Sequence, residues 1–249
     1  MTKRPVAIQL FTLRDRLAND FVGTLEQIAK IGYDGVELAG YGDLTVVELK
    51  ETLDRLGLKV AGSHVPLETL RNNLDQVIAD QKVLDNKFVV CPYLEPEDRR
   101  PEFYQELAQF LNQLGKQLNE AGLVLCYHNH DFELELMPNG QTVLDYLFDQ
   151  TEANNLQAEL DLYWIKKAGQ DPIDWINRYH DRTPLIHLKD MTTDGEQFFA
   201  ELGSGGLDLE GILATGEPEW WIVEQDESRI DPLESIQISY HYLEKRGIV

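Results

Sequence analysis

The stretch that indicates the fold most clearly is Leu123-Val124-Leu125-Cys126-Tyr127-His128-Asn129-His130-Asp131-Phe132-Glu133. An apolar run of strand length ends there in two histidines, an asparagine and two acids, which is typical of a buried strand that emerges into a polar site. Three later segments end in the same way, at 156–161, 184–190 and 220–226. Their polar ends can converge only if the strands are parallel neighbours, so the sequence predicts a parallel sheet.

Short apolar runs alternate with amphipathic segments along the chain, which is typical of repeated strand–helix units. Strands are expected at 6–10, 35–38, 58–63 and 88–91, within 123–133, 156–161 and 184–190, and at 220–224. Helices are expected at 21–31, 45–56, 67–84, 100–121, 142–148, 172–179 and 232–245, with a short helix that Asp208 caps. Eight such units in about 250 residues predict a TIM (β/α)8 barrel, with residues 1–249 as a single domain.

A doubly wound open sheet is the alternative fold for such a pattern. That fold normally carries a Gly-rich phosphate turn after its first strand, and no such turn follows Leu10. A TIM barrel places its active-site residues at the carboxyl ends of the strands, which is where the polar residues of this chain occur. The barrel is therefore the favoured prediction.

The composition limits the classes of partner. The 249 residues include 44 acids and 22 bases, which give a net charge of −22 and predict repulsion of nucleic acid and of anionic membranes. Cys91 and Cys126 lie inside apolar runs and are expected to be buried thiols, which fits a reducing compartment. No apolar run suits a signal peptide or a membrane span, so we expect a soluble cytoplasmic protein, with homo-oligomerisation left open.

Three of the predicted strands end in metal-ligating residue types. Asp161, His187 and Glu224 close strands six, seven and eight, and a barrel would bring them within a few ångströms of one another. Together with a carboxylate from strand five they would form a site of mostly oxygen ligands and one imidazole. Such a site suits a six-coordinate divalent ion, Mn²⁺ first and Mg²⁺ or Co²⁺ as alternatives, rather than tetrahedral zinc.

The contribution of strand five stays open at this point. Alternation along a strand directs His128 and His130 to the same face, whereas Glu133 can join them only if the chain bends after the strand. Its acidity makes Glu133 the first choice as the fourth ligand, and His128 is the alternative. The alternative without function is that these residues form a capped loop in which His130 and Glu133 are exposed.

Other strand ends indicate the kind of ligand. Glu37 and His64 finish strands two and three, Trp164 follows Asp161, and Lys189 is expected to point the same way as His187. An aromatic wall with a few charged donors suits a polyhydroxylated molecule, so these residues and His128 are predicted to bind substrate. The glycine-rich turn 203–206 and Lys189 are the visible candidates for a phosphate site, and a plain turn is favoured, so an unphosphorylated substrate is expected.

Recognisable motifs extend over nearly the whole chain. They are Ile8 to Asp15, Gly35 to Leu38, Ser63 to Leu67, His128 to Glu133, Glu159 to Trp164, His187 to Asp190, Leu202 to Asp208 and Val223 to Asp226. Together they resemble the xylose-isomerase-like TIM barrels, a group of sugar phosphate isomerases and epimerases that also includes inosose dehydratases and, more distantly, metal-dependent apurinic endonucleases. The resemblance implies Asp161, His187 and Glu224 as ligands. At strand five, His128 stands where many epimerases have a glutamate, as in the branch with inosose dehydratases and enzymes of keto sugars or keto-glycosides.

The resemblance and the residues together predict an enzyme that acts on a carbohydrate. We expect a metal-dependent isomerase or epimerase in which Glu224, His130 or Glu133 removes a proton next to a carbonyl, giving a metal-stabilised enediolate. A dehydratase or lyase acting on an inosose or a 3-keto-glycoside would share that first step and is the alternative. A sugar-binding barrel without turnover is a second alternative, and DNA cleavage is disfavoured by the charge and the six histidines.

Overall fold

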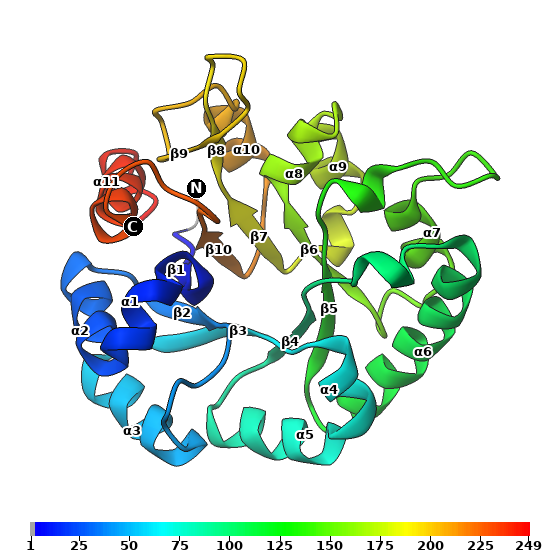
Figure 1. The fold of residues 1–249 in the computed structure, drawn as a ribbon, viewed down its shortest axis with the longest axis horizontal. Coiled ribbons are helices and arrows are strands. Elements are labelled where there is room, and N and C mark those ends of the chain that lie inside the picture. Colours follow the sequence, from blue (N-terminus) through cyan, green and yellow to red (C-terminus); the bar gives the residue numbers. More distant parts are fainter. Residues whose placement is uncertain (1–2) are drawn as a thin grey trace.

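The computed structural model describes residues 3–249. Within them, eight parallel strands close into a barrel in the order β1-β10-β7-β6-β5-β4-β3-β2, and helices surround it (Figure 1). This arrangement confirms the predicted TIM barrel. The barrel strands are β1 Val6–Gln9, β2 Gly35–Leu38, β3 Lys59–His64, β4 Phe88–Cys91, β5 Val124–His128, β6 Gln157–Asp161, β7 Leu185–Leu188 and β10 Trp220–Val223.

The outer layer consists of amphipathic helices that cover the barrel wall. Thr45 forms a capping box with Glu48 at the start of α3, and Asp208 caps α10 as predicted. The helices are α1 Arg14–Asn19, α2 Phe21–Ile31, α3 Val46–Leu56, α4 Leu67–Asn72, α5 Leu74–Val83, α6 Pro101–Glu120, α7 Val143–Asp149, α8 Leu162–Lys167, α9 Pro172–Arg178, α10 Leu209–Thr215 and α11 Pro232–Lys245, with 3-10 turns η1 Leu10–Leu13, η2 Pro96–Asp98, η3 Phe132–Leu134 and η4 His180–Arg182.

Some local elements differ from the prediction. The helix expected at 67–84 is two helices, because Asn73 leaves the helical backbone at φ −136° and ψ 32°. The sequence did not predict the short helices α1 and α8. It also did not predict the antiparallel two-stranded ribbon of β8 Asp190–Met191 and β9 Phe199–Ala200. In residues 3–249, no helix combines the length and the hydropathy needed to span a bilayer.

The interior of the barrel is layered from an apolar floor to a polar mouth. A compact cluster fills the floor, formed by Ala7, Ala61, Phe88, Val90, Cys126, Leu185 and Ile222. Alternate residues on each strand share a face, so the next inward positions on β5, β7 and β10 after Cys126, Leu185 and Ile222 are His128, His187 and Glu224. Cys91 and Cys126 are both buried free thiols, as expected. The strand period therefore positions the site above the floor.

Candidate active site

Four side chains meet at the carboxyl end of the barrel and are called the outer group here: His128, Asp161, His187 and Glu224. Each offers one ligand atom, and these atoms lie within 4.8 Å of one another. The Nδ1 atom of His187 is 2.8 Å from Oε2 of Glu224, and Nε2 of His128 is 3.7 Å from Oδ2 of Asp161. All four residues are buried. The set of two imidazoles and two carboxylates could bind a divalent cation.

The two carboxylate oxygens of Asp161 have different surroundings. Its Oδ1 accepts the backbone N–H groups of Tyr163 and Trp164 at 3.0 and 3.1 Å, which caps α8 directly after β6. Its Oδ2 is buried and lies 2.8 Å from Nζ of Lys189, the cation that compensates its charge. A metal ion in that place would do the same, so Asp161 fits the role of a ligand to an ion.

Below the outer group lie two buried glutamates, the inner carboxylates Glu37 and Glu159. Oε2 of Glu159 is 3.0 Å from Nδ1 of His128 and 2.7 Å from Nε2 of His64. Oε2 of Glu37 is 2.7 Å from Nε2 of His187. Each histidine of the outer group thus has one ring nitrogen bonded to an inner carboxylate and the other directed to the outer group. Carboxylates in this position fix the tautomer and orientation of metal-ligating histidines.

Charge interactions link the inner carboxylates to the histidines around them. Burial disfavours an imidazolium, but Glu37 and Glu159 outweigh burial and raise the pKa of His64 to about 10. His128 behaves in the opposite way, because burial and the neighbouring cations hold its pKa well below the ordinary value. Gly62 in β3 makes room for this layer, since a Cβ atom there would lie 2.5 Å from Oε1 of Glu37. The arrangement keeps His128 neutral and able to offer a lone pair.

Lys189 lies among the carboxylates of the site and is only 1% exposed. Its Nζ is 2.8 Å from Oδ2 of Asp161 and 2.6 Å from Oε2 of Glu224, and it donates to Asp226 at 3.1 Å. The contact with Asp161 is a charge contact without hydrogen-bond geometry. The ammonium thus neutralises the two outer carboxylates, and a metal ion bound between them would have to displace it.

Glu133, the first choice from the sequence for the fourth ligand, lies elsewhere. Its Oε1 accepts the hydroxyl of Tyr127 at 2.8 Å and its Oε2 accepts the backbone N–H of His130 at 2.7 Å. Tyr127 alternates with His128 on β5 and so points away from the barrel interior, and burial raises the pKa of Glu133 to about 8. This geometry corrects the prediction: His128, the alternative, is the strand-five residue in the outer group.

A cavity of about 670 Å³ opens above the outer group. His130 and Trp164 form part of its wall, and both His130 Nδ1 and Trp164 Nε1 are buried without a hydrogen-bond partner in residues 3–249. Burial and the Lys189 charge lower the pKa of His130 to about 3. The lining residues are Phe11, Ala39, Gly40, His64, Pro66, Pro92, Tyr93, His128, His130, Trp164, Phe199, Glu224, Asp226 and Glu227.

The glycine-rich turn beside the barrel mouth is occupied by an internal anion. The carboxylate of Asp190 accepts the backbone N–H groups of Gly203, Gly205 and Leu207, each at 3.0 Å. A Cβ atom at Gly205 would lie 2.3 Å from Oδ1 of Asp190, so this close approach requires glycine. These N–H groups are therefore committed to the fold.

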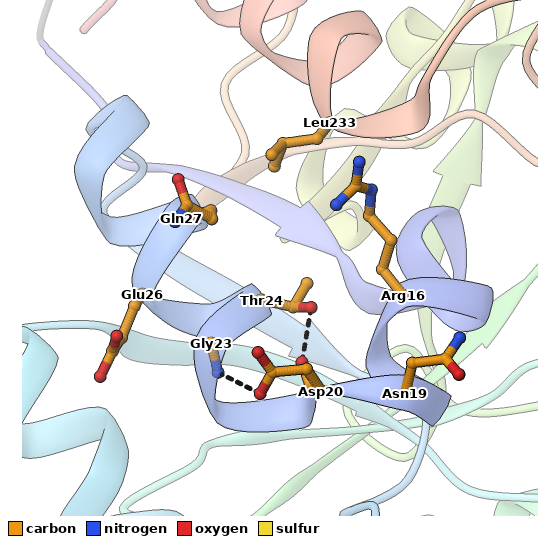
Figure 2. Close-up of a pocket in the computed structure, with 8 residues that line it drawn as sticks. All are labelled: Arg16, Asn19, Asp20, Gly23, Thr24, Glu26, Gln27 and Leu233. Atoms are coloured by element: carbon orange, nitrogen blue, oxygen red, sulfur yellow. Dashed lines mark hydrogen bonds between the residues drawn. The ribbon is translucent and has the colours of Figure 1, made fainter.

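A hollow of about 550 Å³ lies on the outside of the barrel and is lined by residues of α1, α2 and α11 (Figure 2). Asp20 accepts the backbone N–H of Gly23 at 2.9 Å, and its carbonyl accepts the hydroxyl of Thr24 at 2.6 Å. These contacts start α2. In residues 3–249 the groups that could hold a metal ion are the outer group and a second group of His64, His128, Glu159 and His187, and neither includes a residue of this hollow.

A closed parallel barrel with acids and histidines at the carboxyl ends of its strands defines an enzyme-like TIM barrel. Residues 25–244 match the family described as xylose isomerase-like TIM barrel, and the chain belongs to that family. It is 25% identical over 279 residues to an inosose dehydratase of Lacticaseibacillus casei, covering 90% of this chain and 89% of that protein. The inosose dehydratase of Salmonella typhimurium is 23% identical, with 88% and 86% covered.

Solved structures show the same fold. A sugar phosphate isomerase/epimerase from Parabacteroides distasonis superposes with a TM-score of 0.81 at 22% identity, covering 100% of this chain and 96% of that one. An L-ribulose 3-epimerase superposes with a TM-score of 0.75 at 17% identity, covering 98% and 94%. The family and the relatives support an enzyme that modifies a sugar.

Proposed function

We propose that this chain is a divalent-cation-dependent enzyme that removes a proton from the carbon next to the carbonyl of a sugar or keto sugar, acting as an isomerase or epimerase. The observation that carries the proposal is the outer group, whose two imidazoles and two carboxylates are buried and bring four ligand atoms within 4.8 Å of one another. Mn²⁺ fits two imidazoles and two carboxylates better than Mg²⁺, which prefers oxygen ligands.

The residues around the outer group have separate tasks in this proposal. A bound ion would supply Lewis-acid polarisation of the carbonyl. Trp164 and Phe199 form the wall on which the C–H face of a sugar packs. His130 is the proposed base, because it lines the cavity and its Nδ1 has no hydrogen-bond partner in the described chain; the buried ring, with its pKa of about 3, has to open toward the substrate and gain a charged neighbour to act. Glu224, which contacts His187 and Lys189, is the alternative.

Dehydration is the second candidate reaction. It shares the proton-removal step and then expels a hydroxyl from the next carbon. Two observations favour it: the curated relatives are named inosose dehydratases, and β5 contributes His128 rather than a carboxylate to the outer group. The same site therefore supports two outcomes of one first step. A barrel that binds sugar without turnover is the non-enzymatic alternative.

Solvent deuterium exchange tests the proposal. The protein is loaded with Mn²⁺, mixed with a panel of ketoses and inososes in D₂O, and analysed by NMR for deuterium next to the carbonyl and for dehydrated product. We expect exchange in the wild type and its loss in Asp161→Asn. Asp181→Asn is the matched control, because Asp181 is fully exposed and remote from the outer group. Mn²⁺ binding without exchange on any compound would favour the sugar-binding barrel.

A further inference from the structure

Two aromatic side chains at the mouth of the cavity are exposed although both line it. Phe11 is 44% exposed and follows β1, and Tyr93 is 39% exposed and follows β4. These strands are three positions apart in the barrel of eight, so the rings stand on different sides of the mouth. Large exposed aromatic residues on a concave surface indicate a contact with an apolar group.

An arginine guanidinium lies over each ring and also donates hydrogen bonds to backbone carbonyls. The Arg14 guanidinium lies 4.4 Å from the Phe11 ring centre and donates to the backbone carbonyls of Phe11 and Asp226. The Arg99 guanidinium lies 4.9 Å from the Tyr93 ring centre and donates twice to the carbonyl of Leu94. These contacts fix the rings and occupy the arginines. Neither arginine is among the residues that line the cavity.

The cavity offers few free groups to an anion. Its described lining includes Glu224, Asp226 and Glu227 and neither lysine nor arginine, and its one raised-pKa histidine, His64, is already paired with Glu37 and Glu159. The nearby Lys189 is paired with carboxylates, and the N–H groups of the 203–207 turn are donated to Asp190. A phosphate or carboxylate on the outer part of the ligand would therefore face Asp226 and Glu227 with no lysine or arginine of the lining to pair with.

Polarity changes with depth in this cavity. Of the lining residues, His130 and Trp164 have buried ring nitrogens without a hydrogen-bond partner in residues 3–249, whereas Phe11 and Tyr93 are exposed. The volume of 670 Å³ is in the range that holds a drug-sized ligand rather than a single small sugar. A ligand that satisfies both ends needs a hydroxylated part inside and an apolar part outside.

We propose that the substrate is an uncharged two-part molecule: a sugar or cyclitol ring that reaches the outer group, joined to a flat apolar substituent that contacts Phe11 and Tyr93. This inference rests on the proposed function for the position of the ring. It adds the class of substrate, namely neutral glycoside-like compounds rather than sugar phosphates. Phe11 and Tyr93 are then specificity-determining residues for the substituent.

Binding measurements on Mn²⁺-loaded protein test this inference without turnover. The probes are methyl β-D-glucopyranoside, phenyl β-D-glucopyranoside and glucose 6-phosphate, compared by calorimetry. We expect the phenyl compound to bind roughly tenfold more tightly than the methyl compound, as two aromatic contacts would provide. The phosphate should bind most weakly. Phe11→Ala and Tyr93→Ala should each reduce the phenyl preference, whereas Leu136→Ala, a 72% exposed residue outside the cavity, should not.

Three results would overturn the inference: equal binding of the two glucosides, tighter binding of the phosphate, or a dimer that Phe11→Ala and Tyr93→Ala dissociate. The last result, seen by analytical ultracentrifugation, would mean that a second copy covers the two rings. Failure of the proposed function would look different. A phenyl preference without deuterium exchange on any ketone would support the substrate class and reject the proposed proton removal. Exchange without a phenyl preference would support the proton removal and reject the substrate class.

Discussion

Replacing Glu159 with glutamine should weaken metal binding although Glu159 is not in the outer group. Its carboxylate is fully buried and lies 3.0 Å from Nδ1 of His128 and 3.4 Å from Nε2 of His187. As an acceptor it holds the proton of His128 on Nδ1, which leaves the Nε2 lone pair directed to the outer group. A glutamine amide can also donate, so the other tautomer of His128 becomes accessible.

The magnitude follows from the contacts. Loss of one such partner typically costs 10- to 100-fold in metal affinity, or about 1.4 to 2.8 kcal/mol. Glu159 contacts both histidines of the outer group, so we expect a loss near 100-fold. Glu37 contacts only His187 of that group, and Glu159 remains near the same nitrogen, so Glu37→Gln should lose nearer 10-fold.

Titration calorimetry with Mn²⁺ measures both variants, and ¹⁵N NMR of the imidazoles reports the tautomer of His128. Glu219→Gln is a suitable control, since that glutamate is exposed and pairs with Lys87 on the surface. Circular dichroism must show that each variant is folded. A folded Glu159→Gln protein with wild-type Mn²⁺ affinity and an unchanged tautomer would refute the positioning role.

Three further variants test the site. His128→Asn should release Mn²⁺. His130→Asn should retain it and lower turnover by roughly 10² to 10⁴, the usual contribution of a general base. Equal Mn²⁺ binding by both variants would contradict the assignment of His128 to the outer group. Lys189→Met should lower the melting temperature of the metal-free protein, because an unpaired buried charge costs about 3–5 kcal/mol, and Mn²⁺ should restore more stability to it than to the wild type. Glu133→Gln should keep the ion. The pKa of Glu133 is about 8 in the folded protein and about 4.5 in the unfolded chain, so the free energy of unfolding of the wild type should fall as pH rises from 5 to 8. Denaturant titration should show a smaller fall in Glu133→Gln.

The barrel was predictable because its strands carry a simple signal. Each has four to six residues, most are largely apolar, and the amphipathic stripe of α6 separates β4 from β5 without ambiguity. The errors concern elements too short to show a period. The helices α1 and α8 have six residues each, which is less than two turns, and β8 and β9 have two residues each.

The site was predictable where a residue ends a strand and not where the chain bends. Asp161, His187 and Glu224 end strands or directly follow them, and the barrel geometry brings them together. Glu133 lies in η3, where the backbone no longer alternates, and the hydroxyl of Tyr127 holds it on the outer side of β5. Side-chain hydrogen bonds to Tyr127 and His130 decide its position, and the period of the strand contains no information about them.

Glu159 was not among the predicted site residues although its position in the sequence carries a signal. It precedes Asp161 by two residues on β6, so both carboxylates enter the barrel, one layer apart. A glutamate buried in the lower layer is stable only beside cations or hydrogen-bond donors. His64, His128 and His187 provide those partners from three other strands. Depth within the barrel thus distinguishes the two glutamates: Glu224 lies at the mouth with the outer group, and Glu159 lies below it in contact with three histidines.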